Sequence, residues 1–437
     1  MSWFNFFDSK TEIRHLFGRG INADLSKDEE EEFTKSYEAF EAKEILSAYE
    51  HFFNSLQNYS NGISNENVIV KKESDKLNFE IFQGSAKING FITKESIYAE
   101  AILIKRSSAP VALKRLILER NYQLTYAYYF YDDEYIKIKL FLDNITMNPQ
   151  KVFFPLREIA LNCDFDKEYI KSEFLDLPLE DIDHLREVDE PELKLKYDFL
   201  HRWIEETTLK IASLPSNDNA AMQSFVLLYF IFKMDYLLVP KYSIFQKSSR
   251  KVQEYFSDES KTIESKNEEL RVYINELKEI HFEEFKTNFY NARYSFNPTE
   301  KSSHEEIEIF ISDSLAKIRW YKNNRYNQVI PTMYSYIALH ILYNYGLHSV
   351  LKDLLHTLVE IQDPDFFTAL GYIPLYNKES STFAKKVIIS KIDEIITPHQ
   401  SRFKLLKPFG EKLNFKSLNE FSNSFYLEIK NLNFEEI

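Results

Sequence analysis

SSAPVALKRLILERNYQLTYAYYFYDDEYIKIKLFLDN, residues 107–144, predicts a helix, a strand, a tight turn and a second strand, in that order. Ser108 and Pro110 are typical of a helix start, because a capping oxygen and a residue without an N–H are favoured there. Aromatic, β-branched and apolar residues fill positions 124–131. An acidic triplet then reverses the chain, and apolar and polar residues alternate after it. We therefore expect a hairpin with a helix leading into it.

The residues around this stretch extend it into an α+β domain over residues 26–175. Ser26 and Glu29 have the spacing of a capping box, which predicts a helix near the start of the domain. Residues 1–25 show no sustained period and are expected to form a flexible arm. The order of the other segments predicts an antiparallel meander sheet flanked by helices. Its expected strands are 68–71, 77–82, 86–92 and 97–104, and its expected last helix begins at 150 and ends at 162.

The second half of the chain is predicted to be helical. Residues 176–191 are acidic and contain prolines, which is typical of a linker. Residues 192–437 show helical spacing interrupted by prolines, with one expected helical stretch over 242–294. The most apolar run, 220–239, contains Lys233 and Asp235, so we expect a buried helix and not a membrane span.

Composition excludes several classes of protein. The net charge of −14 argues against a general nucleic-acid binder and against binding to an anionic membrane surface. It favours basic partners. The single cysteine, Cys163, forbids an intrachain disulfide and fits a reducing compartment. The N-terminus lacks a signal-peptide pattern, so a cytoplasmic location is expected. No glycine lies between residues 91 and 345, which excludes phosphate-binding glycine loops there, and no cofactor is predicted.

The residues that suggest catalysis or metal binding have simpler structural interpretations. His340, His348 and His356 are spaced by eight, and eight residues turn a helix face by about 80°, so their imidazoles should not converge on a metal. Cys163 has acidic neighbours that disfavour a reactive thiolate. No sequence resembles a nucleophile elbow. We therefore predict no catalytic, cofactor-binding or metal-binding residue, and a protein that is not an enzyme.

Two groups of aromatic residues are candidates for binding a partner. The hairpin contains more tyrosines than one buried sheet face requires. The stretch 319–346 contains both basic and aromatic residues. Arginine and aromatic residues commonly anchor protein interfaces. The alternative for the second group is a helix–helix corner. The candidate partner-binding residues are Tyr126, Tyr128, Tyr129, Tyr131 and Tyr135 in the hairpin, and Trp320, Tyr321, Arg325 and Tyr326 in the second group.

Residues of about 34–175 resemble the YbjN-like domains and the type III secretion chaperone-like fold. The resemblance lies in LKRLILERNYQLTYAYYFYDDEYIKIKLFLDN, where a helix ending in Asn leads into a hairpin, and in the closing helix NPQKVFFPLREIALNCD. It implies an acidic α+β module that holds an extended segment of another protein, or a second copy of itself, against its sheet and helices. This family has no catalytic residues that would transfer to the chain.

The sequence therefore predicts a non-enzymatic protein that binds another protein through the sheet face and edge strands of its first domain. Two alternatives remain open. One is an enzyme or small-molecule-binding protein with a pocket among the C-terminal helices, near Arg325, His340 and Tyr343. The other is a structural homodimer.

Overall fold

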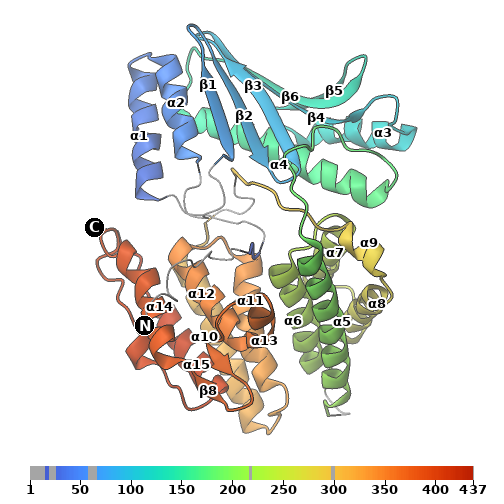
Figure 1. The fold of residues 1–437 in the computed structure, drawn as a ribbon, viewed down its shortest axis with the longest axis vertical. Helices are drawn as coiled ribbons and strands as arrows, with labels where there is room; N and C mark the ends of the chain where they lie inside the picture. Colours follow the sequence, from blue (N-terminus) through green and yellow to red (C-terminus); the bar gives the residue numbers. More distant parts are fainter. Residues whose placement is uncertain (1–14, 19–25, 58–65, 216–218, 297–300, 437) are drawn as a thin grey trace, which may run out of the picture.

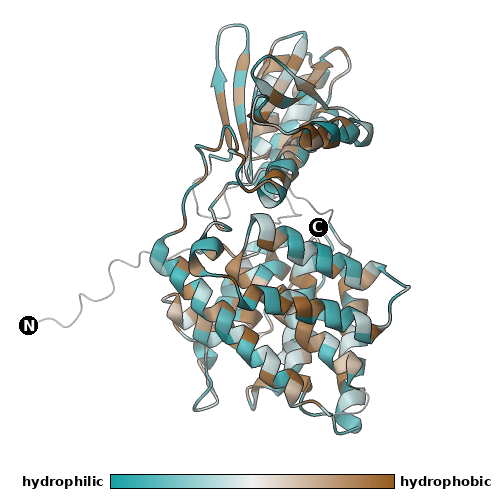
Figure 2. Cartoon of the chain, turned by 90° about the vertical axis from the view of Figure 1, so that its right-hand side faces the viewer, coloured by the Kyte–Doolittle hydropathy of each residue, from teal (hydrophilic) through white to brown (hydrophobic). Residues whose placement is uncertain are grey.

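The computed structural model describes residues 15–18, 26–57, 66–215, 219–296 and 301–436. It contains an antiparallel sheet flanked by helices, followed by a larger helical region (Figure 1). Seen from the side, the sheet domain and the helical domain are two bodies joined by a narrower region (Figure 2). The predicted fold class, α+β followed by all-α, is confirmed.

The sheet has six strands in the order β1-β2-β3-β4-β6-β5, all antiparallel. The first four form the predicted meander, and the predicted hairpin adds the other two beside β4. Asp132 fixes the hairpin turn, because its Oδ1 accepts the N–H groups of Glu134 and Tyr135 at 2.9 and 2.6 Å. The strands are β1 (Val68–Lys72), β2 (Leu77–Gln83), β3 (Ala86–Ile92), β4 (Ser96–Lys105), β5 (Tyr128–Tyr131) and β6 (Tyr135–Asp143).

Helix α4 (Pro149–Glu173) covers one face of the sheet (Figure 1). Alternate strand residues such as Ile88, Ala101 and Ile138 are fully buried on this inner face, as the period of two predicts. No helix of the described chain lies over the opposite, outer face (Figure 1). The other helical elements of this domain are α1 (Lys27–Glu41), α2 (Ile45–Ser55), α3 (Val111–Arg120) and the 3-10 turn η1 (Asn121–Gln123).

Of two predicted helix caps, one is confirmed and one is wrong. The capping box of Ser26 and Glu29 is present at the start of α1. Ser108 does not cap α3, so that prediction was wrong. Pro110 has an extended backbone and occupies the N-cap position itself, where it provides no side-chain hydrogen bond.

The helical domain begins at α5 and also contains one very short hairpin, β7–β8. The expected helical stretch 242–294 is three helices followed by an extended segment, so its last part was predicted wrongly. The elements are α5 (Glu190–Ala212), α6 (Ala220–Leu238), α7 (Tyr242–Ser257), α8 (Ile263–Lys278), α9 (Phe282–Lys286), α10 (His304–Asn323), α11 (Ile330–Asn344), α12 (Ser349–Gln362), α13 (Pro364–Ala369), β7 (Tyr376–Asn377), β8 (Thr382–Phe383), α14 (Lys385–Ile396), η2 (Thr397–His399), η3 (Gly410–Lys412) and α15 (Leu418–Lys430).

Helix α6 is the one helix in the described chain that is long and apolar enough to cross a membrane, and 78% of its most apolar window is buried inside the protein. The surroundings of its two charged residues are those of a protein core. Lys233 pairs with Asp363 and lies 4.3 Å from the ring centroid of Trp203. Asp235 is 4% exposed.

The connection between the two domains enters the sheet at its end nearest the helical domain. Pairing between β3 and β4 stops at Asn89 and Glu100, and the strands separate beyond it. Glu180 N donates to Leu103 O at 3.2 Å in this gap, and the buried Lys167 donates to the carbonyl of Glu180 at 2.7 Å. This stretch of the expected linker is therefore fixed against the first domain.

A second segment, residues 289–296, returns from the helical domain to the sheet domain; we call it the returning segment. Gln83 Oε1 accepts the N–H groups of Ser295 and Phe296 at 3.2 and 2.9 Å. Gly84 N donates to Arg293 O at 2.9 Å. The ring of Phe296, 2% exposed, is part of the core of the sheet domain.

Truncating this ring should destabilise the sheet domain, although the residue follows the helical elements α7–α9 in sequence. Phe296→Ala is expected to lower the free energy of unfolding of that domain by about 3–5 kcal/mol, because it leaves a cavity in a packed core. Urea unfolding measures the change. Phe141→Ala is the matched control, since the Phe141 ring is 60% exposed and its loss should cost less than about 0.5 kcal/mol. Equal effects of the two substitutions would contradict this role of Phe296.

Candidate functional site

The outer face of the sheet contains aromatic side chains in register across three strands. Phe91 on β3 lies opposite Tyr98 on β4, and Tyr98 lies opposite Phe141 on β6. Phe91 is 39% exposed and Phe141 is 60% exposed. This row lies beside the β3–β4 turn, at the end of the sheet away from the helical domain (Figure 1). It presents a continuous apolar strip that no described helix covers.

The neighbouring positions combine aromatic rings with charges. Tyr128 and Phe130 lie on the same face of β5, opposite Lys139 and Lys137. The Nζ atom of Lys139 is 3.8 Å from the ring centroid of Phe130. We name the five rings together the aromatic sheet face: Phe91, Tyr98, Tyr128, Phe130 and Phe141.

The five tyrosines predicted from the hairpin do not lie together, because neighbouring residues of a strand point to opposite faces. Tyr128, 45% exposed, is on the outer face, and Tyr135 is half-buried on the same face. Tyr126 precedes β5 and is 45% exposed. Tyr129 and Tyr131 belong to the inner side, where their hydroxyls donate to Asp166 and to the carbonyl of Lys114. The inner pair is therefore not part of the outer face.

Side chains occupy part of the free edge of β5. Asn121 Oδ1 accepts the N–H of Tyr129 at 2.6 Å, and its Nδ2 donates to the carbonyl of the same residue at 3.2 Å. Glu158 accepts three successive N–H groups just before the strand, from Thr125, Tyr126 and Ala127. These bonds disfavour addition of another strand at this edge of the sheet.

The second predicted group does lie together, at the corner between α10 and α11. The ring centroids of Trp320 and Tyr326 are 6.2 Å apart, and those of Tyr321 and Tyr326 are 6.0 Å apart. Arg325 is exposed and has a φ of 63°, which makes the tight turn. Trp320 is 56% exposed. The group is thus a helix–helix corner that also presents an aromatic surface.

The three histidines have separate surroundings: His340 is on α11, His356 is on α12, and His348 is the N-cap residue of α12, so they do not belong to one continuous helix. His340 stacks on Phe310 at 4.3 Å and His348 on Phe434 at 4.4 Å. Burial lowers the pKa of His340 to about 4, so its ring is neutral at neutral pH. No three His, Cys, Asp or Glu side chains of the described residues are grouped as metal ligands. Cys163 is buried in the sheet-domain core, which raises the pKa of its thiol to about 12.

Part of the predicted arm is packed. The ring of Phe17 lies 4.9 Å from His356 and 5.1 Å from Phe367, and Gly18 N donates to Tyr236 O at 2.8 Å. The expectation of a flexible arm was therefore wrong for residues 15–18. The remaining residues of the arm lie outside the described part of the chain.

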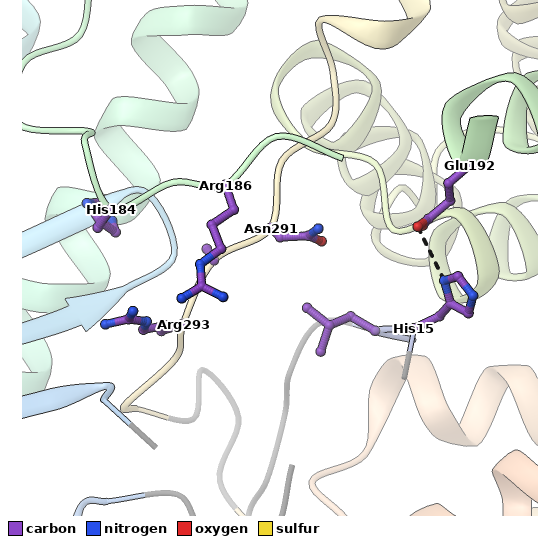
Figure 3. A pocket seen from close by; sticks show the side chains of 8 residues that line it. His15, His184, Arg186, Glu192, Asn291 and Arg293 are labelled. Atoms are coloured by element: carbon purple, nitrogen blue, oxygen red, sulfur yellow. Dashed lines mark ion pairs between the residues drawn. The ribbon is translucent and has the colours of Figure 1, made fainter. Parts of the chain in front are cut away.

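Two cavities lie at the junction of the domains. The smaller one is lined by two arginines, two histidines, the carboxylate of Glu192 and three uncharged residues (Figure 3). His15 Nδ1 is 3.3 Å from Glu192 Oε2 on one side, and Arg186 and Arg293 line the other side (Figure 3). Arg293 is held by Glu66, to whose carbonyl its Nη1 donates at 2.8 Å.

The larger cavity adjoins a cluster of buried charges that the sequence analysis did not identify. Asp164 and Glu168 are one turn apart on α4, and Lys241 precedes α7. Glu168 accepts the N–H of Tyr242 at 2.5 Å and the hydroxyl of Tyr290. The i, i+4 spacing of Asp164 and Glu168 was the available signal, but α4 contains several other charged residues, and the spacing gave no indication that α7 and the returning segment would cover these two.

The surroundings of these three charged residues shift their pKa values. Burial, and then the charge of Asp164, raise the pKa of Glu168 to about 7. Burial also raises the pKa of Asp164. Burial acts to lower the pKa of Lys241, but Tyr294 and Glu168 outweigh it and raise that pKa, so the ammonium stays charged.

Comparison with known proteins gives no assignment. No protein-family model matches the chain, and no curated protein matches its sequence. The features that bear on function are therefore the aromatic sheet face and the cavities at the domain junction.

The raised pKa of Glu168 predicts a pH dependence of stability. Between about pH 4.5 and 7 the folded state keeps a proton on Glu168 that the unfolded chain releases, so this residue's contribution to stability is present at low pH and decreases as the pH rises. Glu168→Gln should remove the effect. The stability of the variant relative to the wild type is expected to increase across this window, by up to about 1.4 kcal/mol for each pH unit.

Urea unfolding of both proteins at several pH values measures this difference, and the contributions of groups that do not interact with residue 168 cancel. Glu173→Gln, at the exposed end of the same helix, is the control and should show a constant difference. A constant difference for Glu168→Gln as well would show that the carboxylate titrates normally.

Proposed function

We propose that the chain is a non-enzymatic binding protein that holds a segment of a partner protein on its aromatic sheet face. The observation that carries this proposal is the row of Phe91, Tyr98 and Phe141, in register across β3, β4 and β6, over which no helix of the described residues lies. Aromatic rings exposed together in water gain free energy when a partner buries them. The resemblance to YbjN-like domains and secretion chaperones supports the same mode of binding.

Charge favours a partner segment with apolar and basic residues. The chain has a net charge of −14, which attracts a basic segment toward the molecule. On the outer face itself Glu100 is paired with Lys137 at 3.1 Å, so the apolar contact comes from the rings and the charge preference from the chain as a whole. The corner formed by Trp320, Tyr321, Arg325 and Tyr326 provides a second contact in this proposal. A cytoplasmic location remains part of it.

Photo-crosslinking in the host cell tests the proposal. A benzophenone amino acid replaces Phe141 in one variant and Tyr122, which is 93% exposed and lies outside the sheet, in the control. We expect one discrete adduct with another protein at position 141 and none at 122. Phe91→Ala in the first variant should reduce the yield several-fold, because it removes the neighbouring ring but not the crosslinker.

The identity of the adduct separates the proposal from its alternatives. Mass spectrometry should find peptides of a different protein, with basic and apolar residues near the link. An adduct with a second copy of this chain would instead support the structural homodimer. Equal labelling at both positions, or no adduct at 141, would reject the sheet face as a binding surface.

A further inference from the structure

A second candidate binding site is the smaller of the two cavities at the domain junction (Figure 3). Its volume is about 120 Å³. A usual small-molecule pocket occupies about 300–1,000 Å³, and a cavity of about 150 Å³ can hold one benzene molecule. The cavity therefore has room for one small ion or for one group of a larger ligand.

Three segments that are far apart in the sequence bring the lining residues together. Arg186 lies in the connection between the domains, and Arg293 lies in the returning segment. These two segments pair with each other: Arg186 N donates to Asn291 O at 3.0 Å, and Asn291 N donates to Arg186 O at 2.8 Å. His15 belongs to the N-terminal arm. A ligand in the cavity therefore connects all three segments.

The guanidinium group of Arg186 has no hydrogen bond or ion pair with any other described residue. The one carboxylate among the lining residues, that of Glu192, already has other partners. Its Oε1 is 2.8 Å from the Nζ atom of Lys196, and its Oε2 is 3.3 Å from Nδ1 of His15. Arg186 therefore brings a positive charge to the cavity without a counter-ion from the described chain.

Arg293 adds a second guanidinium group whose place is fixed. Its Nη1 donates to the carbonyl of Glu66 at 2.8 Å, and the group lies 5.2 Å from the ring centroid of Phe82. Its Nη2 is 3.3 Å from the carboxylate of Glu66, but that side chain is 65% exposed, so water weakens the pair. Because a guanidinium group has five N–H donors, these contacts do not use all of them.

Each of the two histidines has one nitrogen without a partner among the described residues. His184 Nε2 is 3.1 Å from Gly84 O and carries a proton there, because a carbonyl oxygen only accepts; its Nδ1 has no partner. His15 Nδ1 faces the carboxylate of Glu192, and its Nε2 has no partner. Protonation would turn each of these nitrogens from an acceptor into a donor. The cavity can therefore offer donors from imidazoles as well as from arginines.

We propose that this cavity binds a phosphate group, either as free phosphate or as the end of a small phosphate ester. Arg186 and Arg293 donate to its oxygens from one side, and His15 does so from the other side (Figure 3). A tetrahedral dianion suits donors on two sides and two guanidinium charges, whereas a carboxylate has two oxygens and one charge. This site is independent of the proposed binding of a protein segment on the sheet face.

Isothermal titration of the full chain at constant ionic strength tests the ligand class. At pH 7.0 we expect saturable 1:1 binding of inorganic phosphate and at least tenfold weaker binding of acetate. Glycerol 3-phosphate distinguishes the two sources: binding as tight as that of phosphate supports an ester, and clearly weaker binding supports the free ion. Acetate that binds as tightly as phosphate would overturn the proposal.

A pair of variants tests the position of the anion. Arg186→Gln should weaken phosphate binding by roughly tenfold or more, since it removes a charge-assisted hydrogen bond. Arg115→Gln, at an exposed position of α3, changes the net charge equally and should leave binding unchanged. Urea unfolding of both variants verifies that they fold. Equal weakening by the two substitutions would reject the assigned site.

The pH dependence of binding tests the role of the imidazoles. Burial lowers the pKa of His184, with a smaller contribution from Lys167, and Asp181 and Asp183 act in the opposite direction. A bound anion favours the protonated ring, so anions should bind more tightly at lower pH. Sulfate keeps its charge between pH 8 and pH 6, and its affinity should increase several-fold over that range. A constant or decreasing affinity would overturn the placement of the anion beside the histidines.

Hydrogen exchange of the wild-type protein gives a readout that does not depend on folding of a variant. Phosphate should slow amide exchange in residues 15–18, 184–187 and 291–293 and leave β5 and β6 unchanged. The proposal is overturned if millimolar phosphate produces neither heat nor protection of these segments.

Discussion

The hydrogen bonds from the backbone of the returning segment to Gln83 hold the two domains in one arrangement. This side chain is 2% exposed, and its Oε1 accepts two successive N–H groups at the end of an extended segment. The bonds bring Phe296 into the core of the sheet domain and place Tyr290 and Tyr294 beside α4. Next to Gln83, Gly84 has a φ of 54°, and a Cβ atom there would lie 2.2 Å from the carboxylate of Asp164. Only glycine permits this close approach of the β2–β3 turn to α4.

The two candidate binding regions follow from this arrangement. The helical domain meets the sheet at the end where β3 and β4 separate, so the opposite end and the outer face remain open. Phe91 and Phe141 are exposed there, and the rings of Phe91 and Tyr98 stack at 5.4 Å. At the junction the same packing buries carboxylates and an ammonium beside a cavity. An exposed apolar face is suited to a macromolecule, whereas a concave cavity is suited to a small ligand.

Prediction of the candidate sites was least complete where distant segments meet. The hairpin was recognised, but its tyrosines were taken as one group, and the alternation along β5 divides Tyr128 from Tyr129. Trp320 and Tyr326 were grouped correctly because they are six residues apart at one turn. The pair of Glu168 and Tyr290 is separated by 122 residues. No local pattern connects such residues, so the junction cluster was not found.

The sequence by itself determined the six strands, the hairpin turn at Asp132, the capping box at Ser26 and the helical character of the second half. These features depend on periodicity and on hydrogen bonds between residues close in the chain. Only the tertiary structure decided which face of the sheet stays open, where Phe296 packs and which carboxylates are buried together. The physical reason is that burial depends on which surfaces meet, and residues far apart in the chain meet only when the whole chain has folded.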